Sequence, residues 1–333
     1  MKKATMRDLC DETGLSLGTV SKYLNGGQLK EKNRKKLDEA IERLNYRVDE
    51  YARGLITNRT RTVGIITTRL DNLFYSSIIS DVETKLYEKG YAAIIKESGY
   101  DLSKEIKGIE WFLSRRVDAL IIIPVGRKKE DYEILNEAEV PVLFLDSYIE
   151  GVRCESIVTD NEEISRHAID WLISKGHKKI SIILDKDNPY TAERRLEGYR
   201  QAFKENGMEE EDYRIYRINE SIDSGYAVAK QIVTETDSTA IFASNYISTV
   251  GVVYLLNELD IRVPEDISVL GFDDILITSL YRPKLTIINQ PIEKISQLAV
   301  DRLFELLSEE NKEYKTHLLE NELIIGKTVA DIN

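Results

Sequence analysis

The stretch GLSLGTVSKYLNGG, residues 14–27, combines a turn with a short amphipathic helix. Gly14 can turn the chain, and Ser16 can cap a helix over residues 17–24. The apolar stripe of this helix, at i, i+3 and i+4, consists of Val20, Tyr23 and Leu24. The opposite face points outward and holds Leu17, Gly18, Ser21, Lys22 and Asn25.

Helical patterns lie on both sides of this stretch. Thr5 and Asp8 form a T-x-x-D capping box ahead of a first helix. A third helix is predicted by apolar residues at Leu37, Ala40, Ile41 and Leu44. Residues 1–46 are therefore predicted to form a three-helix head, and residues 47–60 a linker that can become helical.

The outward face of residues 17–24 suits DNA, because a helix-turn-helix lays its second helix in the major groove. Lys22 can donate to guanine O6 and N7, and Leu17 can meet a thymine methyl group. Gly18 lets the backbone approach closely. The helical pattern taken alone also fits an ordinary helical hairpin with a charged face.

Charge is distributed unevenly along the chain. The net charge is −12, yet residues 1–61 contain 14 Lys and Arg against 9 Asp and Glu. A basic head on an acidic body is typical of a protein that touches phosphate with one end only.

From Thr62 onward, apolar runs rich in β-branched residues alternate with amphipathic helical patterns. The strands expected are TVGIITT, YAAIIKE, ALIIIP, PVLFLD, KISIILD, RIYRI, TAIFAS and ISVLGFDD. Continuous apolar strands separated by helices indicate parallel sheets covered on both faces. The series starts twice, near Thr62 and near Lys178, which predicts two α/β lobes with a ligand cleft beyond the carboxyl ends of the strands.

Several classes of protein are disfavoured. There is no secretory signal and no apolar stretch of membrane-spanning length, so we expect a cytoplasmic protein. Cys10 and Cys154 are too far apart in sequence to suggest a disulfide framework or zinc site. His167, His177 and His317 share no metal-ligand spacing. We expect neither an enzyme nor a bound cofactor or metal.

The sequence ATMRDLCDETGLSLGTVSKYLNG, followed by AIERLNYRVDEYARGL, resembles the N-terminus of the LacI/GalR family of bacterial transcriptional repressors. Further matches in the family's order are VTDNEE, GHKKI, RRLEGYRQAF, TAIFASN, VPEDISVLGFDD and LTIINQPI. The resemblance covers nearly the whole chain. It implies a helix-turn-helix head and a two-lobed, periplasmic-binding-protein-like body with parallel sheets.

The resemblance assigns roles on DNA. Base-reading residues would be Leu17, Gly18 and Lys22, although lysine replaces the commoner arginine and lacks its planar fork. Contacts to phosphates or adjacent bases would come from Thr5, Ser16, Thr19, Ser21 and Asn25. The segment YARGL resembles a hinge helix in which Leu55 wedges into the minor groove and Arg53 lies near phosphate.

The resemblance also divides the body and places an effector. The first lobe would comprise residues 61–161 and 291–321, and the second residues 162–290 and 322–333. Effector-binding residues carried over by motif are Phe74, Asp146, Arg195, Asn245 and Asp273. Carboxylates, an arginine and an aromatic ring suit a sugar.

Three of these effector assignments have a structural alternative. Arg195 can be a surface arginine, Asp273 can cap a turn, and Phe74 can be part of the core. Tyr190 can form a second aromatic wall, but we favour an exposed loop tyrosine.

The sequence therefore predicts a homodimeric repressor of carbohydrate-related genes. It would bind a pseudo-palindromic double-stranded operator and respond to a sugar or sugar derivative between its lobes. Two alternatives stay open at this point. The body can bind a phosphoprotein co-repressor, or the chain can be a sugar-binding protein without a DNA function.

Overall fold

The computed structural model of the chain describes residues 4–24, 27–46, 59–275, 278, 280–308 and 313–333. The chain divides into two compact units, residues 1–60 and residues 61–333, which we call the head and the body. Three predicted DNA contacts, Asn25, Arg53 and Leu55, lie outside the described residues.

The head contains three helices, α1 (Met6–Thr13), α2 (Leu17–Leu24) and α3 (Glu31–Arg43). The predicted capping box is present, because the Thr5 N–H donates to the Asp8 carboxylate at 2.6 Å and the Asp8 N–H donates to Thr5 Oγ1 at 3.3 Å. Gly14 ends α1 at a φ of 69°, a conformation that glycine adopts without a steric penalty. The three helices enclose a small core of Leu9, Val20, Leu37, Ala40 and Tyr46.

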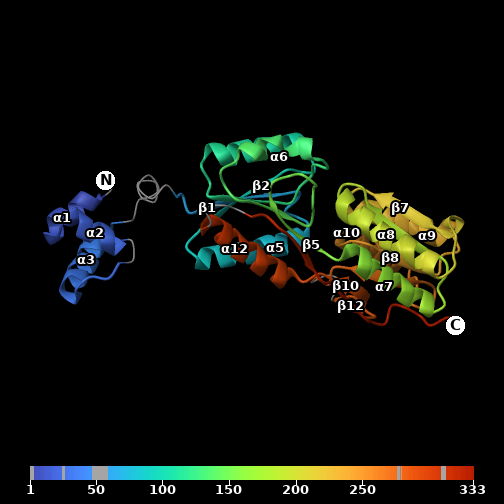
Figure 1. The fold of residues 1–333 in the computed structure, drawn as a ribbon. Helices are drawn as coiled ribbons and strands as arrows, with labels where there is room; N and C mark the ends of the chain where they lie inside the picture. The colour runs from blue at the N-terminus through green and yellow to red at the C-terminus, as the bar shows by residue number, and fades with distance from the viewer. Residues whose placement is uncertain (1–3, 25–26, 47–58, 276–277, 279, 309–312) are drawn as a thin grey trace. The chain divides into compact units, whose positions relative to one another are not determined.

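The first lobe of the body is built on a six-stranded parallel sheet with the order β11-β5-β4-β3-β1-β2. Its strands are β1 (Thr62–Thr67), β2 (Ala92–Glu97), β3 (Ala119–Ile122), β4 (Val142–Leu145), β5 (Glu155–Thr159) and β11 (Thr316–Leu319). Two helices on one face are α5 (Leu73–Glu88) and α12 (Ile292–Ser308), and the other face carries α6 (Leu102–Ser114) and the 3₁₀ segment η1 (Lys129–Glu137) (Figure 1). The central strands are buried on both sides, as their continuous apolar runs predicted.

The second lobe repeats this plan with the sheet order β12-β10-β9-β8-β6-β7. Its strands are β6 (Ile180–Asp185), β7 (Arg214–Ile218), β8 (Ala240–Ala243), β9 (Ser268–Phe272), β10 (Thr286–Asn289) and β12 (Glu322–Ile324), of which β12 pairs antiparallel with β10. The helices α7 (Asn161–Ser174) and α8 (Pro189–Glu205) cover one face. The other face is covered by α9 (Ile222–Glu235) and α10 (Tyr246–Glu258), and a 3₁₀ turn η2 (Glu210–Asp212) precedes β7.

The chain passes between the two sheets three times: after β5, after β10 and between β11 and β12. Hydrogen bonds join these three connections. Thr159 Oγ1 donates to Gln290 Oε1 at 3.1 Å, and the Asn321 N–H donates to Asp160 Oδ1 at 2.8 Å. The three connecting segments therefore lie side by side and are joined by hydrogen bonds, and the lobes can hinge at this point.

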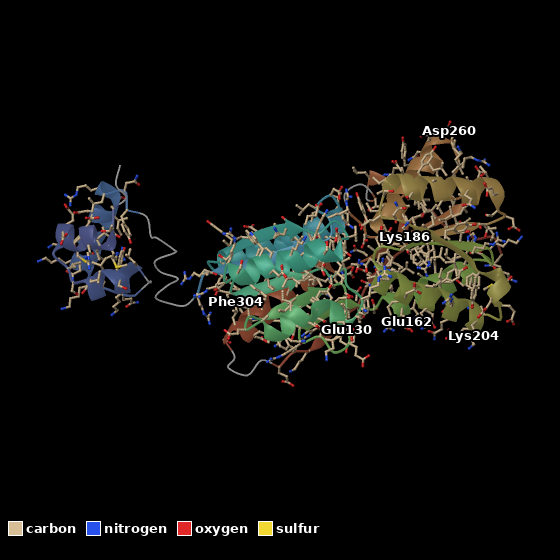
Figure 2. All side chains as sticks on the ribbon, turned by 90° about the horizontal axis from the view of Figure 1, so that it is seen from above. Glu130, Glu162, Lys186, Lys204, Asp260 and Phe304 are labelled. Atoms are coloured by element: carbon tan, nitrogen blue, oxygen red, sulfur yellow. The ribbon has the colours of Figure 1, made fainter. Side chains whose placement is uncertain are left out.

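The surface of the body is charged, with side chains such as Glu130, Lys204 and Asp260 projecting from its outer faces (Figure 2). Within the described ranges, no helix is both long enough and apolar enough to cross a membrane. The predicted strands correspond to β1–β4 and β6–β9, and the final apolar strand expected beside Gly326 corresponds to β12, whereas β5, β10 and β11 were not predicted as strands.

Candidate functional site

Helix α2 presents the outward face that its sequence pattern predicted. Val20 is fully buried in the head, while Leu17, Gly18 and Lys22 are exposed. Leu17 has 53% of its surface exposed, so its side chain is accessible to a partner. A Cβ placed on Gly18 would meet nothing within 4 Å, so the backbone there is open to close approach by a partner.

The start of α2 is held in place by its own side chains and by α3. The Ser16 and Thr19 hydroxyls hydrogen-bond at 2.9 Å, and the Thr19 N–H donates to Ser16 Oγ at 3.3 Å. Tyr23 donates to Asp38 of α3, which ties α2 to the next helix. Thr5 is exposed as the N-cap of α1, and Ser21 is half-buried. Their contacts with phosphate remain predictions.

The second candidate site is a cavity between the lobes, which we call the inner cavity. It is lined by the five predicted effector residues Phe74, Asp146, Arg195, Asn245 and Asp273. The lining also includes residues that the sequence did not single out for this role: Asn72, Tyr75, Asp185, Asn188, Thr191, Glu220, Tyr246, Ile247 and Gln290. Its free volume is about 30 Å³, enough for one or two water molecules but not for a sugar.

Arg195 is not a surface arginine. It projects from α8 into the lobe, is 96% buried, and stacks over the Phe272 ring with 3.7 Å between the guanidinium carbon and the ring centroid. Its Nε donates to Asn161 Oδ1 at 2.7 Å, and its Nη1 donates to the Ser244 carbonyl oxygen. Burial lowers the pKa of this guanidinium, and the charges of Asp273 and Asp146 oppose that shift.

Asp146 and Asp273 each follow the carboxyl end of a parallel strand, β4 and β9 respectively. Asp146 accepts a hydrogen bond from Tyr75 Oη at 2.9 Å, and Asp273 accepts one from Gln290 Nε2 at 2.9 Å. Burial raises the pKa of Asp146 to about 6 and also raises that of Asp273. Asp273 therefore does more than cap a turn, since its carboxylate reaches the wall of the inner cavity.

Phe74 and Asn245 combine structural positions with a place on the cavity wall. Phe74 is 96% buried and belongs to the first-lobe core as well as to the lining. Asn245 is the N-cap of α10, and its Oδ1 accepts the Ser248 N–H at 2.8 Å. Their effector contacts remain predictions.

Three hydrogen bonds cross the inner cavity from one lobe to the other. Asn188 Nδ2 of the second lobe donates to Tyr75 Oη at 2.8 Å and to Asp146 Oδ2 at 3.3 Å. Asn72 Nδ2 of the first lobe donates to Glu220 Oε1. These amide groups hold the lobes together by donating hydrogen bonds to acceptors that the hydroxyl groups of a bound polyol could also use.

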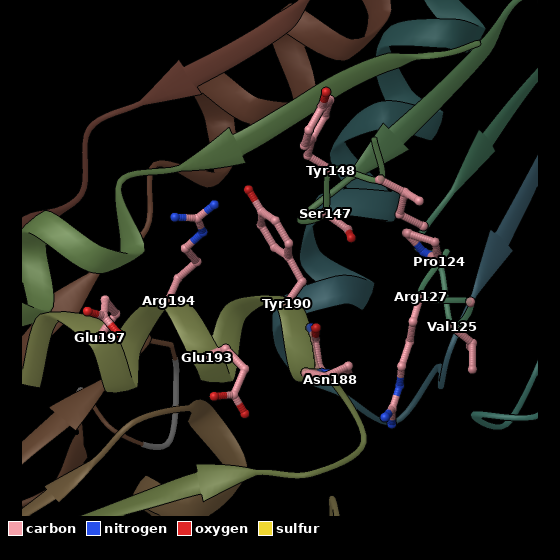
Figure 3. Close-up of a pocket in the computed structure, with 13 residues that line it drawn as sticks. Pro124, Val125, Arg127, Ser147, Tyr148, Asn188, Tyr190, Glu193, Arg194 and Glu197 are labelled. Atoms are coloured by element: carbon pink, nitrogen blue, oxygen red, sulfur yellow. The ribbon is translucent and has the colours of Figure 1, made fainter. Parts of the chain in front are cut away.

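An outer cavity of about 540 Å³ opens beside the inner one. The segments after β3 and β4 line it from the first lobe, and the first turns of α8 line it from the second. Tyr190, favoured from sequence as an exposed loop residue, is instead half-buried at the start of α8 (Figure 3). It projects toward the segment carrying Ser147 and Tyr148, with its ring 5.9 Å from the Arg194 guanidinium carbon. Pro189 is the first residue of α8, a frequent place for proline, so the sequence did contain a sign that Tyr190 begins a helix rather than lying in a loop.

Three of the missed residues could have been found from their positions after predicted strands. Asp185 ends β6, Glu220 lies two residues after β7, and Tyr246 lies three residues after β8. All three lie at carboxyl ends of parallel strands, where ligands of such sheets bind. They belong to no motif that is recognisable by itself, so they escaped selection.

Comparisons with known proteins identify relatives of nearly the whole chain. Residues 169–329 match the periplasmic binding protein-like domain family. The HTH-type transcriptional repressor PurR of Vibrio atlanticus (strain LGP32) is 30% identical over 99% of this chain and 100% of its own length. Catabolite control protein A of Priestia megaterium is 30% identical over 92% of this chain and 93% of its own. The lac repressor dimer bound to operator and the anti-inducer ONPF superimposes with a TM-score of 0.87 at 26% identity, covering 99% of this chain and 100% of that one.

A three-helix head and a two-lobed ligand-binding body in one chain define a ligand-responsive, DNA-binding transcriptional regulator rather than an enzyme. The chain belongs to the LacI/GalR family of transcriptional regulators.

Proposed function

We propose that this chain is a homodimeric repressor of carbohydrate-related genes that inserts α2 into the major groove of each half of a pseudo-palindromic operator. The exposed face of α2 supports this most directly, because Leu17, Gly18 and Lys22 are outside the head core that fixes their helix. A two-fold symmetric protein requires a site with matching symmetry. The relative bound to operator is a dimer, which agrees with this arrangement.

The inner and outer cavities together are the proposed effector site. Solved relatives include a transcriptional regulator CelR in complex with cellobiose, at 25% identity and a TM-score of 0.72. In the present chain, an effector that enters would replace the amide donors of Asn72 and Asn188 and change how the lobes close. We place this regulator in the cytoplasm, where its operator would be.

A pair of lysine variants tests the DNA-reading role of α2. Lys22→Ala removes a donor from the proposed base-reading face, and Lys36→Ala removes the same charge from the exposed side of α3. Fluorescence anisotropy would compare DNA from upstream of the protein's own gene with a scrambled duplex of equal length. We expect Lys22→Ala to cost about 1–3 kcal/mol of discrimination between the two duplexes. Lys36→Ala should change the affinity for both duplexes by a similar factor, because the loss of one exposed positive charge carries no sequence information.

Two results would contradict the proposal. Equal losses on both duplexes for Lys22→Ala would remove that residue from its role in base reading. Binding of the unaltered protein that depends on salt but never on sequence would remove the operator itself. If sequence-specific binding needs an added phosphoprotein and responds to no small molecule, the body serves a protein co-repressor instead.

A further inference from the structure

The inner cavity contains more negative charge than its single cation balances. Four carboxylates line it, each near the carboxyl end of a different strand: Asp146, Asp185, Glu220 and Asp273. Arg195 is the only cationic side chain in the described lining. Among the described residues, its hydrogen bonds go to the Asn161 side-chain amide oxygen and to the Ser244 carbonyl oxygen rather than to these carboxylates. With all five groups ionised, the wall has a formal charge of −3.

Each of these carboxylates has some support from the protein, but Glu220 has the least. Asp185 accepts the Asp187 N–H at 2.7 Å, while Asp146 and Asp273 accept side-chain donors as described above. Glu220 accepts Asn72 with Oε1, yet its buried Oε2 has no hydrogen-bond partner among the described residues. A buried acceptor without a donor costs about 1–3 kcal/mol, and more when charged.

A second polar atom on the same wall also has no protein partner. Tyr246 is 97% buried and lines the inner cavity, and its hydroxyl has no hydrogen-bond partner in the described part of the chain. Buried hydroxyls are nearly always satisfied by protein, water or ligand. The wall therefore presents an acceptor at Glu220 and a hydroxyl at Tyr246 that the described protein groups leave unused.

Burial dominates the ionisation of the carboxyl groups on this wall, although the Arg69 charge partly opposes the pKa shift of Glu220. Burial raises the pKa of Glu220 to about 7 and that of Asp185 to about 6. A cation placed beside these groups would favour their ionised forms, whereas an anion would add repulsion in a poorly solvated space. Phosphorylated sugars and sugar acids are therefore disfavoured as ligands.

Building on the proposed effector site, we propose that the effector is a small polyhydroxy compound with a protonated amine, of the amino-sugar class, whose ammonium group donates to Glu220. Its hydroxyl groups would meet Asp146, Asp273 and the Tyr246 hydroxyl. Entry requires the lobes to part, because the inner cavity is far smaller than a hexose. The ammonium and hydroxyl donors then take over acceptors that Asn72 and Asn188 occupy in the present closure.

Calorimetric titration of the full chain at pH 7 with a matched set of sugars tests this inference. The probes are glucosamine, glucose, N-acetylglucosamine and glucuronate, with the corresponding galacto and manno compounds. In at least one series we expect the amine to bind about tenfold or more tightly than its neutral counterparts, equivalent to about 1.4 kcal/mol. The acid should bind more weakly than either. No binding by any amine, or equal binding of amine and neutral sugar, overturns the inference.

Two isosteric variants locate the charge that matters. Glu220→Gln keeps an acceptor for Asn72 but removes the charge, so it should bring the ratio of amine to neutral-sugar affinity to about one. Glu265→Gln is the matched control, an exposed residue before the amino end of β9 and at the opposite end of that strand from Asp273. An amine preference that survives Glu220→Gln overturns the assignment.

Operator binding by the same preparations separates the two proposals. Sequence-specific DNA binding without an amine preference defeats only the amino-sugar inference. Loss of both sequence-specific DNA binding and sugar binding defeats the proposed function itself.

Discussion

At the residue scale, Glu105 is a carboxylate of α6 with no exposed surface, yet it has a clear structural task. It accepts the Val125 N–H at 2.9 Å and the Tyr132 hydroxyl, which itself accepts the Gly126 N–H at 2.9 Å. Val125 and Gly126 line the outer cavity. Glu105 therefore fixes one wall of the cleft from behind, and its burial raises its pKa to about 7.

This raised pKa makes the stability of the body depend on pH. Between the ordinary glutamate pKa of 4.5 and about 7, the folded state binds more protons than the unfolded state. The free energy of unfolding therefore falls as pH rises through this window, by up to about 3 kcal/mol from Glu105. Urea unfolding at pH 5 and pH 8, followed by tryptophan fluorescence, should show a smaller fall for Glu105→Gln than for the unaltered chain.

Glu105→Gln has to be compared with the unaltered chain, because the pKa values of Asp146, Asp185 and Glu220 are also raised. These three groups add to the fall of stability with pH in both proteins. Parallel pH profiles for Glu105→Gln and the unaltered chain would mean that Glu105 does not ionise differently in the fold.

Only some of the residues that line the cleft could be identified from the sequence. Family motifs led to Arg195, Asp146 and Asp273, and all three line one cavity in the structure. Glu220 and Asp185 could not be chosen by motif, since acidic residues after strands are common and usually solvated. Only the packing of two lobes against each other shows that these carboxylates are enclosed.

At the element scale, helices and central strands were predictable because each signal was local. The capping box of α1 and the apolar stripe of α2 lie within a few residues, and the central strands are continuous apolar runs. Strand β5 was missed because it is short and begins with a charged residue, Glu155. In the fold this carboxylate is fully buried and accepts from Arg302 Nε at 2.6 Å, 147 residues away along the chain. Strand β11 was missed because it is a short edge strand whose side chains are exposed or half-exposed.

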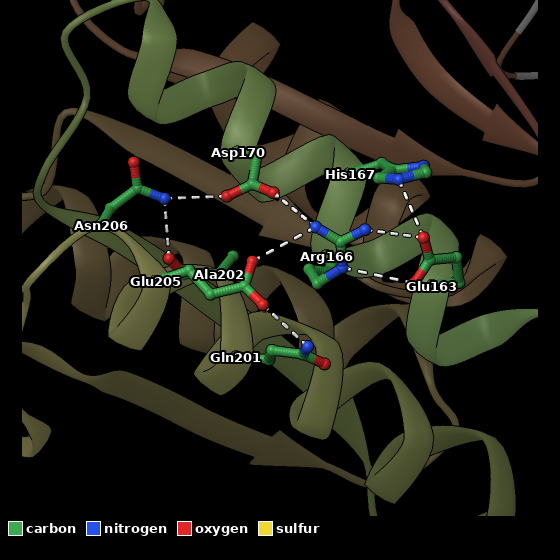
Figure 4. A network of polar contacts seen from close by, with 8 residues as sticks. All are labelled: Glu163, Arg166, His167, Asp170, Gln201, Ala202, Glu205 and Asn206. Carbon is green, nitrogen blue, oxygen red and sulfur yellow. Dashed lines mark hydrogen bonds and ion pairs between the residues drawn. The ribbon is translucent and has the colours of Figure 1, made fainter.

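The contact between α7 and α8 depends on the absence of one side chain. Arg166 of α7 reaches Glu163, Asp170 and Glu205 on its exposed side (Figure 4). On the inner side, a Cβ at Gly198 would lie 2.1 Å from the Glu162 carbonyl oxygen and 2.8 Å from the Arg166 nitrogen. Both are backbone atoms, so the helices can pack this closely only with glycine at the contact.

Gly198→Ala should therefore destabilise the body by about 1–3 kcal/mol through overpacking. Gly108→Ala on α6 is the matched control, because the nearest atom to its Cβ is the flexible end of Ile66 at 3.2 Å. The control should be close to neutral, since better helix propensity offsets a slight crowding. Urea unfolding of both variants checks this, and equal effects would mean that the α7–α8 contact adjusts freely.

At the scale of the whole molecule, the basic head is the part for DNA binding and the acidic two-lobed body is the part for effector binding. The charge asymmetry was visible in the sequence, as was the repeated α/β pattern. The closure of the lobes by Asn72 and Asn188 was not visible, because each hydrogen bond joins residues far apart in the chain.

Coupling between the two sites has to be reciprocal if the effector controls DNA binding. Such couplings are typically 1–3 kcal/mol, or about 5–150-fold in affinity. Titrating glucosamine into the protein with and without operator should give the same factor as titrating operator with and without glucosamine. The direction, release or tightening, defines the effector as inducer or co-repressor. Factors of one in both titrations would mean that the cleft and the head act independently.

The three passages of the chain between lobes also affect how the protein is made. Helix α12 and strand β11 complete the first lobe, but they follow almost all of the second lobe in sequence. During synthesis, the apolar face later covered by Ile295, Ala299 and Leu303 stays open until residues 292–319 leave the ribosome. The first lobe is therefore translated first in large part but completes its fold late. A chain released early would expose the uncovered apolar face of its sheet, which is prone to aggregate.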